Sequence, residues 1–395
     1  MLDPAAVREE LTAAGLDGWL LYDFRGSNPL AHRLLGLDER PSQSRRLFYF
    51  IPAVGEPRAL VHRIERGSLD HLPGAKHVYL SRQELRAGLV AVLGEAGRVA
   101  MEYVPNAGNP YVSTVDAGTV DLVRACGTEV VSSGDLIGRF LSTLTEAQRT
   151  DHLRAAAVVE DAFAFATSLI HETTVGGGTI EEGEIRDRLL AFFSRKGCMS
   201  YSPPIVARGV HGADCHYETG TGQDTALRRG DFLLLDMWCK VDRPSAPYAD
   251  ITRCFTFGRD PSPREAEAFA AVVRGRDAAL NLIRDRFAAD EPVRGWEADR
   301  VARDLIDAAG YGEAFVHRTG HSMGVNTTHG EGTHLDDLET RDERLFLPNT
   351  CFTIEPGVYV DGEVGVRSEI DVLIEPDGTV RVTGGDPQMR IERVG

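Results

Sequence analysis

The chain has 395 residues, of which 42% are hydrophobic and 26% charged, and this is ordinary for a globular protein of about two domains. Its formal net charge of −17 disfavours nucleic acid or an anionic membrane as a partner, because phosphate groups would be repelled. The six cysteines form no CxxC pair, which favours free thiols in a cytoplasmic protein, and neither residues 1–15 nor the apolar stretch 231–241 predicts a signal peptide or a membrane span.

Residues 1–143 alternate between helical and strand patterns and predict an α/β domain. The expected elements are a helix at 5–15, a buried strand at 17–23, a hairpin at 45–62 that turns at Gly55-Glu56-Pro57, a helix at 85–97 and a strand at 98–103. This region contains no phosphate-binding glycine loop and no cluster of catalytic residue types.

Residues 144–395 predict a second domain of the α+β class, which begins with a long amphipathic helix. Thr145 stands before Glu146 as the N-cap of that helix. Further helices are expected at about 180–197, 262–286 and 296–309, with strands dominating up to Phe257 and again at the end of the chain. The order helix, helix, strands therefore occurs twice, which suggests two related halves.

Five potential metal ligands follow one another in the second domain: Asp236, Asp250, His321, Glu355 and Glu369. Asp236 closes the apolar run LLLD, and Asp250 lies in YADITRCF beyond the turn-rich stretch 241–247. A hairpin would bring the two carboxylates close together, as two bridged cations require. Each aspartate taken singly has an ordinary interpretation, as a turn cap or a solvated strand residue.

The remaining three ligands lie in short segments of a similar kind. Small residues flank His321 in RTGHSMG, so that the backbone can approach a ligand closely. Glu355 and Glu369 lie in apolar, β-rich runs, where a cation would compensate their burial, although pairing with Arg367 is the alternative. Four carboxylates and one imidazole, without a thiolate, favour Mn²⁺, Co²⁺, Fe²⁺ or Zn²⁺ in a site that hydrolyses amides or phosphoesters.

These residues and their contexts resemble the metallopeptidases with the pita-bread fold, the group of methionine aminopeptidase, aminopeptidase P and prolidase. The resemblance covers the last 250 or so residues and rests on DITR, GH-x-x-G, EPG-x-Y and R-x-E around the ligands. It implies a catalytic domain with two halves related by a pseudo-twofold axis. The α/β domain is similar to the one that precedes the catalytic domain in aminopeptidase P, prolidase and creatinase, which favours the proline-directed branch.

The resemblance implies a role for each ligand. Asp236 would hold one metal ion, His321 and Glu355 the other, and Asp250 and Glu369 would bridge both. Glu355 would also take the proton of the bridging water as that water attacks the carbonyl carbon, and would return it to the leaving nitrogen. Two divalent ions per subunit are expected, with Mn²⁺ ahead of Co²⁺ or Zn²⁺.

The substrate side is implied by four further residues. His216 and His317 match the histidines of the family's proline pocket, and Arg367 matches an arginine at the edge of the metal site that could pair with a product carboxylate. His329 would stabilise the oxyanion. It stands one residue later than the family's pattern, which falls here on Thr328.

Two other departures from the family are visible. The aspartates are three residues further apart than is usual, within the stretch 241–247. The tyrosine often found shortly before Ile205 is displaced, with Ser202 at its place and Tyr201 beside it.

The resemblance implies a homodimeric hydrolase of the Xaa-Pro bond, most like a bacterial Xaa-Pro dipeptidase. An aminopeptidase P acting on longer peptides shares all five ligands and is the main alternative. A pita-bread binding module without catalysis is disfavoured because all five ligands are kept. A dinuclear phosphoesterase is disfavoured because such sites use more histidines.

Overall fold

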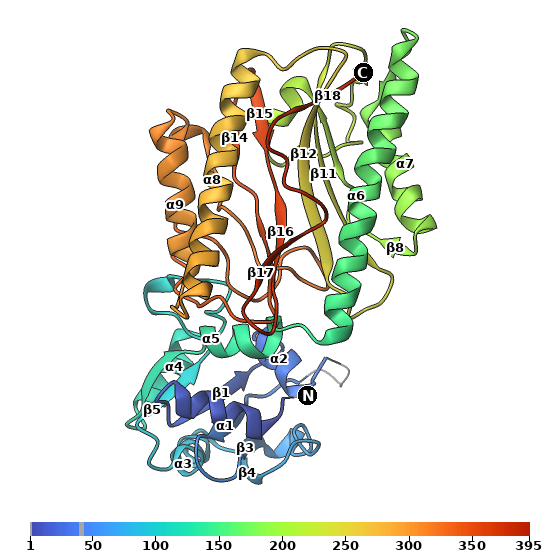
Figure 1. Cartoon of the computed structure of the whole chain (residues 1–395). Helices are drawn as coiled ribbons and strands as arrows, with labels where there is room; N and C mark the ends of the chain where they lie inside the picture. The colour runs from blue at the N-terminus through green and yellow to red at the C-terminus, as the bar shows by residue number, and fades with distance from the viewer. Residues whose placement is uncertain (1, 39–42) are drawn as a thin grey trace. The chain divides into compact units, whose positions relative to one another are not determined.

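The computed structural model describes residues 2–38 and 43–395 and divides into two compact units (Figure 1). The first unit ends at Leu141 and the second runs from Ser142 to Gly395. All six cysteines lie among the described residues and are free thiols. Within the described ranges, no helix is both long enough and apolar enough to cross a bilayer.

The first unit is built on a six-stranded sheet with the order β4-β3-β2-β1-β5-β6. Only β2 runs antiparallel to its neighbours. The strands are β1 (Gly18–Asp23), β2 (Leu47–Pro52), β3 (Arg58–His62), β4 (Ala75–Tyr79), β5 (Arg98–Met101) and β6 (Glu129–Ser132). The predicted hairpin at 45–62 is confirmed, as β2 and β3.

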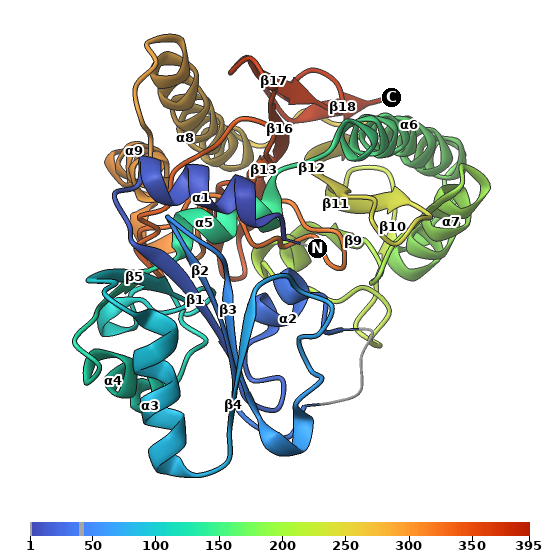
Figure 2. The same cartoon turned by 90° about the horizontal axis from the view of Figure 1, so that it is seen from below.

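Helices cover both faces of this sheet (Figure 2). One face packs against α1 (Pro4–Ala13), α2 (Pro29–Leu35) and α5 (Gly134–Ile137), and the other against α3 (Arg82–Leu93) and α4 (Ala117–Arg124). Helix α3 begins three residues before the predicted range because Ser81 and Glu84 form a capping box. The α/β class predicted for this region is confirmed.

The second unit repeats the order helix, helix, strands. Long helices flank its strands, with α6 and α7 on one side and α8 and α9 on the other (Figure 1). The first half comprises α6 (Glu146–Val175), β7 (Ile180–Glu181), α7 (Glu182–Arg195), β8 (Cys198–Met199), β9 (Ile205–Arg208), β10 (Ala226–Leu227), β11 (Phe232–Val241) and β12 (Tyr248–Phe257). The second half comprises α8 (Pro263–Ala288), α9 (Gly295–Ala308), β13 (Cys351–Ile354), β14 (Gly357–Val360), β15 (Val364–Arg367), β16 (Ile370–Ile374), β17 (Val380–Thr383) and β18 (Glu392–Val394).

Strands β11 and β12 form an antiparallel hairpin that is buried along its whole length. Alternate side chains, such as Leu235, Met237 and Ile251, join the apolar core against α6, which presents small residues such as Ala155 and Ala162. The opposite face carries Asp236 and Asp250 together with apolar residues such as Leu234 and Trp238. The expectation that Asp236 ends its strand is wrong, because the buried run continues through Val241 and the turn comes only at 242–247.

Candidate metal centre

The register of the β11–β12 hairpin places both aspartates on one face. Asp236 is paired with Thr252, and Asp250 is paired with Trp238. Paired residues and residues two apart share a face of a sheet, so the two carboxylates are diagonal neighbours. Both are nearly inaccessible, at 7% and 5% relative exposure.

His321 is brought to this face by a segment that runs along β13. Its backbone N–H donates to the Thr353 hydroxyl at 3.0 Å, and its carbonyl accepts from Thr353 N at 2.8 Å. The Glu355 N–H donates to the carbonyl of Thr319 at 2.7 Å. Gly320 permits this close approach, since a Cβ there would overlap the carbonyl oxygen of Thr353.

The hydrogen bonds of His321 select its tautomer. Nδ1 donates to the carbonyl oxygen of Ser322 at 3.1 Å, so Nε2 keeps its lone pair. Nε2 lies 3.3 Å from Glu355 Oε1 and 3.9 Å from Asp250 Oδ2. An imidazole held in this way is ready to bind a metal ion through Nε2.

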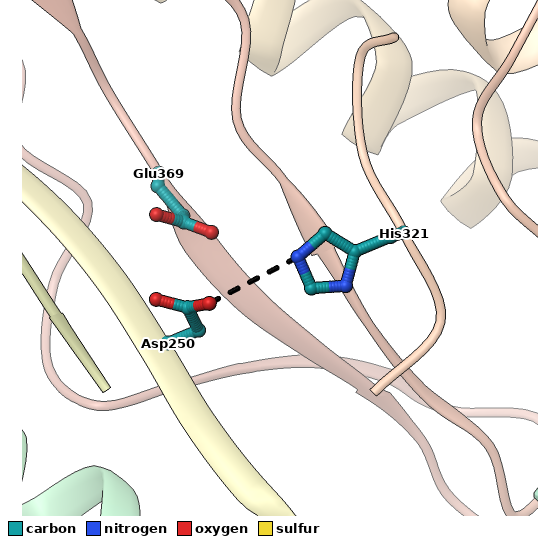
Figure 3. A group of neighbouring side chains, drawn as sticks. All are labelled: Asp250, His321 and Glu369. Carbon is teal, nitrogen blue, oxygen red and sulfur yellow. Dashed lines mark ion pairs between the residues drawn. The ribbon is translucent and has the colours of Figure 1, made fainter. Parts of the chain in front are cut away.

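Asp250, His321 and Glu369 point toward one another (Figure 3). One ligand atom of each lies within 4.8 Å of the others, although the residues come from β12, the segment before β13 and the segment between β15 and β16. Asp250 Oδ1, Glu369 Oε1 and the nearby Asp236 Oδ1 are buried and accept no hydrogen bond. Since buried carboxylate oxygens are otherwise paired, this donor set fits divalent cations.

Burial and mutual repulsion perturb the acids of the cluster. Burial, followed by the charge of Asp236, raises the pKa of Asp250 well above its usual range, and burial with the charge of Asp250 does the same to the pKa of Glu369. Burial raises the pKa of Glu355 to about 7. The pKa of His321 is lowered, first by burial and then by the neighbouring His329. Without a cation, the anionic carboxylates are therefore held at a cost in free energy.

Arg367 is buried beside the cluster, and its guanidinium group already contacts three side chains. Its guanidinium forms an ion pair with Asp236 Oδ2, donates from Nε to the Thr252 hydroxyl at 3.0 Å and donates from Nη1 to the Tyr359 hydroxyl at 2.8 Å. Thr252 Oγ1 donates in turn to Glu369 Oε2 at 2.7 Å. In this structure Arg367 thus orients the side chains of the cluster.

The three substrate-side histidines are placed differently. His317 lies near the Arg367 network, with Nε2 2.9 Å from the Tyr359 hydroxyl, and burial lowers its pKa to about 3. His329 stacks on His321, with ring centroids 4.0 Å apart. Desolvation of its ring lowers the pKa of His329 to about 4, although the residue as a whole is exposed. His216 lies in an exposed turn after residue 213, within electrostatic range of both other histidines.

A tight loop explains how His329 reaches His321. Gly330 N donates to the Ser322 carbonyl at 2.7 Å, and Gly324 N donates to the Thr328 carbonyl at 2.8 Å. Thr328 is buried at the same loop, 3.5 Å from the hydroxyl of Tyr201. The loop therefore directs His329, rather than Thr328, to His321.

Four polar residues near the cluster were not singled out from the sequence: Thr252, Thr353, Tyr359 and Asp371. Strand alternation could have found Thr252, which shares a face with Asp250. Asp371 accepts the backbone N–H of Asp250 at 3.0 Å, and its other carboxylate oxygen has no partner. Tyr359 belongs to the EPG-x-Y motif, which assigns it no role. Nothing in the local sequence signals Thr353, whose role depends on contacts across strands.

Comparison with known proteins identifies the family. Residues 151–376 match the model of metallopeptidase family M24. A protein named probable dipeptidase PepE from Mycobacterium bovis is 29% identical over 328 residues, covering 78% of this chain and 80% of its own.

Two solved structures share the whole architecture. Dipeptidase PepE from Mycobacterium ulcerans has a TM-score of 0.67 at 23% identity, covering 99% of this chain and 96% of its own. The Xaa-Pro dipeptidase from Bacillus anthracis has a TM-score of 0.59 at 21% identity and covers 98% of both chains. The pita-bread fold expected from the sequence is thereby confirmed, and the chain belongs to metallopeptidase family M24.

Proposed function

We propose that this protein hydrolyses the peptide bond before proline, chiefly in Xaa-Pro dipeptides, with two divalent metal ions per subunit. The observation that supports this most is the set of buried carboxylate oxygens without hydrogen-bond partners on Asp236, Asp250 and Glu369, beside the lone pair of His321 Nε2. Glu355 Oε1, 3.3 Å from His321, completes the donor set. The names of the similar proteins, dipeptidase and Xaa-Pro dipeptidase, agree with the proposal.

Two ions bound by these five residues would polarise the substrate carbonyl and lower the pKa of a bound water. In this proposal Asp250 and Glu369 would hold both ions, Asp236 would hold one, and His321 and Glu355 would hold the other. Mn²⁺ suits this oxygen-rich set best, and Co²⁺ or Zn²⁺ is also compatible.

Residues of the chain itself would transfer the proton, stabilise the oxyanion and bind the substrate. Glu355 takes and returns a proton, and the Thr353 hydroxyl, which donates to Glu355 Oε1 at 3.1 Å, orients it. His329 donates to the oxyanion from its place against His321. His317 and His216 line the proline side, and Arg367 orients the cluster and adds a fixed positive charge.

An Xaa-Pro aminopeptidase acting on longer peptides is the second candidate, because it would use the same ligands. The two activities differ in whether the cleft beyond proline accepts more residues. A non-catalytic binding protein is a third candidate, which the five retained ligands disfavour.

The deciding experiment compares Ala-Pro, Ala-Pro-Ala and Ala-Ala, each digested by protein loaded with Mn²⁺, Co²⁺ or Zn²⁺ and followed by liquid chromatography. Preferential cleavage of Ala-Pro supports the dipeptidase. Faster release of alanine from Ala-Pro-Ala establishes the aminopeptidase, and equal cleavage of Ala-Ala overturns proline specificity. Less than one metal equivalent after reconstitution, with no cleavage, favours the binding protein.

We also propose that the protein is a cytoplasmic homodimer that binds neither nucleic acid nor membranes. The net charge of −17 disfavours nucleic acid and anionic membranes, and the six free cysteines are typical of a reducing compartment. The dimer is proposed from the family resemblance alone. Equilibrium sedimentation would test the dimer.

A further inference from the structure

A pocket of about 760 Å³ lies within the first unit, and none of its lining residues belongs to the candidate metal centre. It is formed where β1, β3 and β4 end, and its wall includes Tyr22, His62 and Tyr79. Open α/β sheets bind ligands beyond the carboxyl ends of their strands. The volume falls in the range of small-molecule sites, roughly 300–1,000 Å³.

The charge of this pocket is opposite to that of the whole chain. Its lining holds three arginines, Arg45, Arg46 and Arg82, against one carboxylate, Asp116. Asp116 is turned toward its own helix, where its oxygens accept from Thr119 N at 2.9 Å and Thr119 Oγ1 at 2.8 Å. The chain carries a net charge of −17, so this local surplus of cations requires a separate explanation.

Two of the guanidinium groups are available to a ligand. Arg45 donates to Ser44, both to its carbonyl at 3.2 Å and to its hydroxyl at 3.0 Å. Among the residues that the structure describes, neither Arg46 nor Arg82 forms an ion pair. Arginine prefers carboxylate and phosphate groups, which it binds through two parallel hydrogen bonds.

Aromatic residues form another part of the lining. Tyr22, Phe24 and Tyr79 line it, and Phe24 leaves 40% of its surface exposed. The Tyr79 ring packs edge-on against His62, with centroids 5.0 Å apart, and its hydroxyl donates to the Arg46 carbonyl at 2.8 Å. An aromatic surface beside unpaired guanidinium groups suits a flat molecule that carries an anionic group.

The loop that carries Phe24 is held in place before any ligand arrives. Both oxygens of the Asp23 carboxylate are used, one accepting from Gly26 N and the other from Asn28 N, each at 3.0 Å. Asn28 is buried and also bonds to Glu102 at 2.8 Å. A site fixed in this way loses little conformational entropy when it binds.

We propose that this pocket binds a small organic anion with a planar apolar body, whose phosphate or carboxylate lies against Arg46 and Arg82. A nucleoside monophosphate and an aromatic acyl amino acid share this chemistry. Neither the peptidase reaction nor its metal ions enter this proposal.

Calorimetric titration of the full chain with adenosine 5′-monophosphate and with N-acetylphenylalanine tests the proposal. At least one should bind saturably, and its neutral analogue, adenosine or N-acetylphenylalanine amide, should bind at least tenfold more weakly. Arg46→Gln should weaken the anion at least tenfold. Arg63→Gln, which changes an exposed arginine of the same unit outside the pocket lining, is the matched control and should leave binding unchanged.

The controls separate a specific site from nonspecific anion binding and from loss of folding. Binding that survives in Arg46→Gln, or binding by neither anion, overturns the proposal, as does inorganic phosphate binding as tightly as the nucleotide. A thermal midpoint of Arg46→Gln equal to that of Arg63→Gln shows that lost affinity is not lost folding. If Arg46→Gln does not fold, Arg82→Gln replaces it with the same expected loss of affinity.

Discussion

Arg367 donates to the Tyr359 hydroxyl at 2.8 Å, and that hydroxyl lies 2.9 Å from His317 Nε2. His317 Nδ1 donates to the Arg318 carbonyl at 2.7 Å, so Nε2 is the acceptor and the tyrosine hydroxyl is its donor. Since Arg367 also pairs with Asp236, one line of contacts joins Asp236 to His317. We therefore expect the proposed metal site and the proposed proline pocket to be coupled.

Tyr359→Phe tests this coupling. The change leaves Arg367 Nη1 and His317 Nε2 without a buried partner, at a cost of roughly 1.5–3 kcal/mol. We expect kcat/KM for Ala-Pro to fall about 10- to 100-fold while two metal ions per chain are retained. Metal analysis beside steady-state kinetics checks this. Unchanged kinetics would show that the hydroxyl does not position His317.

Glu369→Gln tests the metal centre itself. The amide removes a negative charge and one of the unpaired buried oxygens, so we expect loss of metal binding and of activity together. Glu363→Gln is the control, because Glu363 is an exposed residue whose carboxylate lies 3.4 Å from Arg264. Metal content by mass spectrometry and Ala-Pro hydrolysis are the measurements, and full turnover by Glu369→Gln refutes the assignment.

Gly320→Ala tests the close approach between the His321 segment and β13. The new methyl group overlaps the Thr353 carbonyl, and the backbone must move. We expect weaker metal binding and a destabilisation of roughly 1–3 kcal/mol. Gly176→Ala is the control, since its φ is −86° and nothing lies within 4 Å of an added Cβ. Chemical denaturation of both variants checks the expectation, which fails if they are equally stable.

His152 should make stability depend on pH. It is buried, with Nδ1 donating to the Tyr248 carbonyl at 2.8 Å, and burial lowers its pKa from 6.5 to about 4. The unfolded chain then binds the proton first as pH falls through 6.5. Folding free energy is accordingly lost between pH 6.5 and 4, by up to about 3 kcal/mol, and the loss levels off below 4.

Unfolding curves of the wild type and His152→Gln at several pH values measure this contribution as a difference. The difference in unfolding free energy between the two proteins should change between pH 6.5 and pH 4 and stay constant above pH 7. His171→Gln, a change of the same kind on the same helix, is the control for the substitution itself. A constant difference between the wild type and His152→Gln contradicts the expectation.

The sequence predicted those features that depend on local pattern. The hairpin carrying Asp236 and Asp250 follows from two apolar runs around a turn, and the long helix follows from Thr145 before an amphipathic stretch. Thr145 indeed caps α6, with Gln148 completing the capping box. These features could be predicted because each depends on neighbours within a few residues.

Contacts between distant segments could not be predicted. Arg367 and Asp236 are 131 positions apart, and their pairing exists only because the two halves of the second unit pack together. The apolar run LLLD predicts that the strand ends at Asp236, but β11 continues to Val241. A charged residue within a buried strand, such as Asp236, points to a functional site. The local sequence pattern alone cannot distinguish such a residue from one that ends a strand.

Strand β11 packs Leu235 and Met237 in the core against α6 and presents Asp236 to the opposite face, so packing of the core helps to fix the spacing of the carboxylates. The protein must therefore hold several like charges together before any ion arrives. Binding of the ions relieves this repulsion, and ligand linkage converts that relief into resistance to unfolding, about 2.7 kcal/mol when free metal exceeds its dissociation constant 100-fold. A cell's supply of divalent ions would thus set how long the folded enzyme lasts, as well as how fast it works.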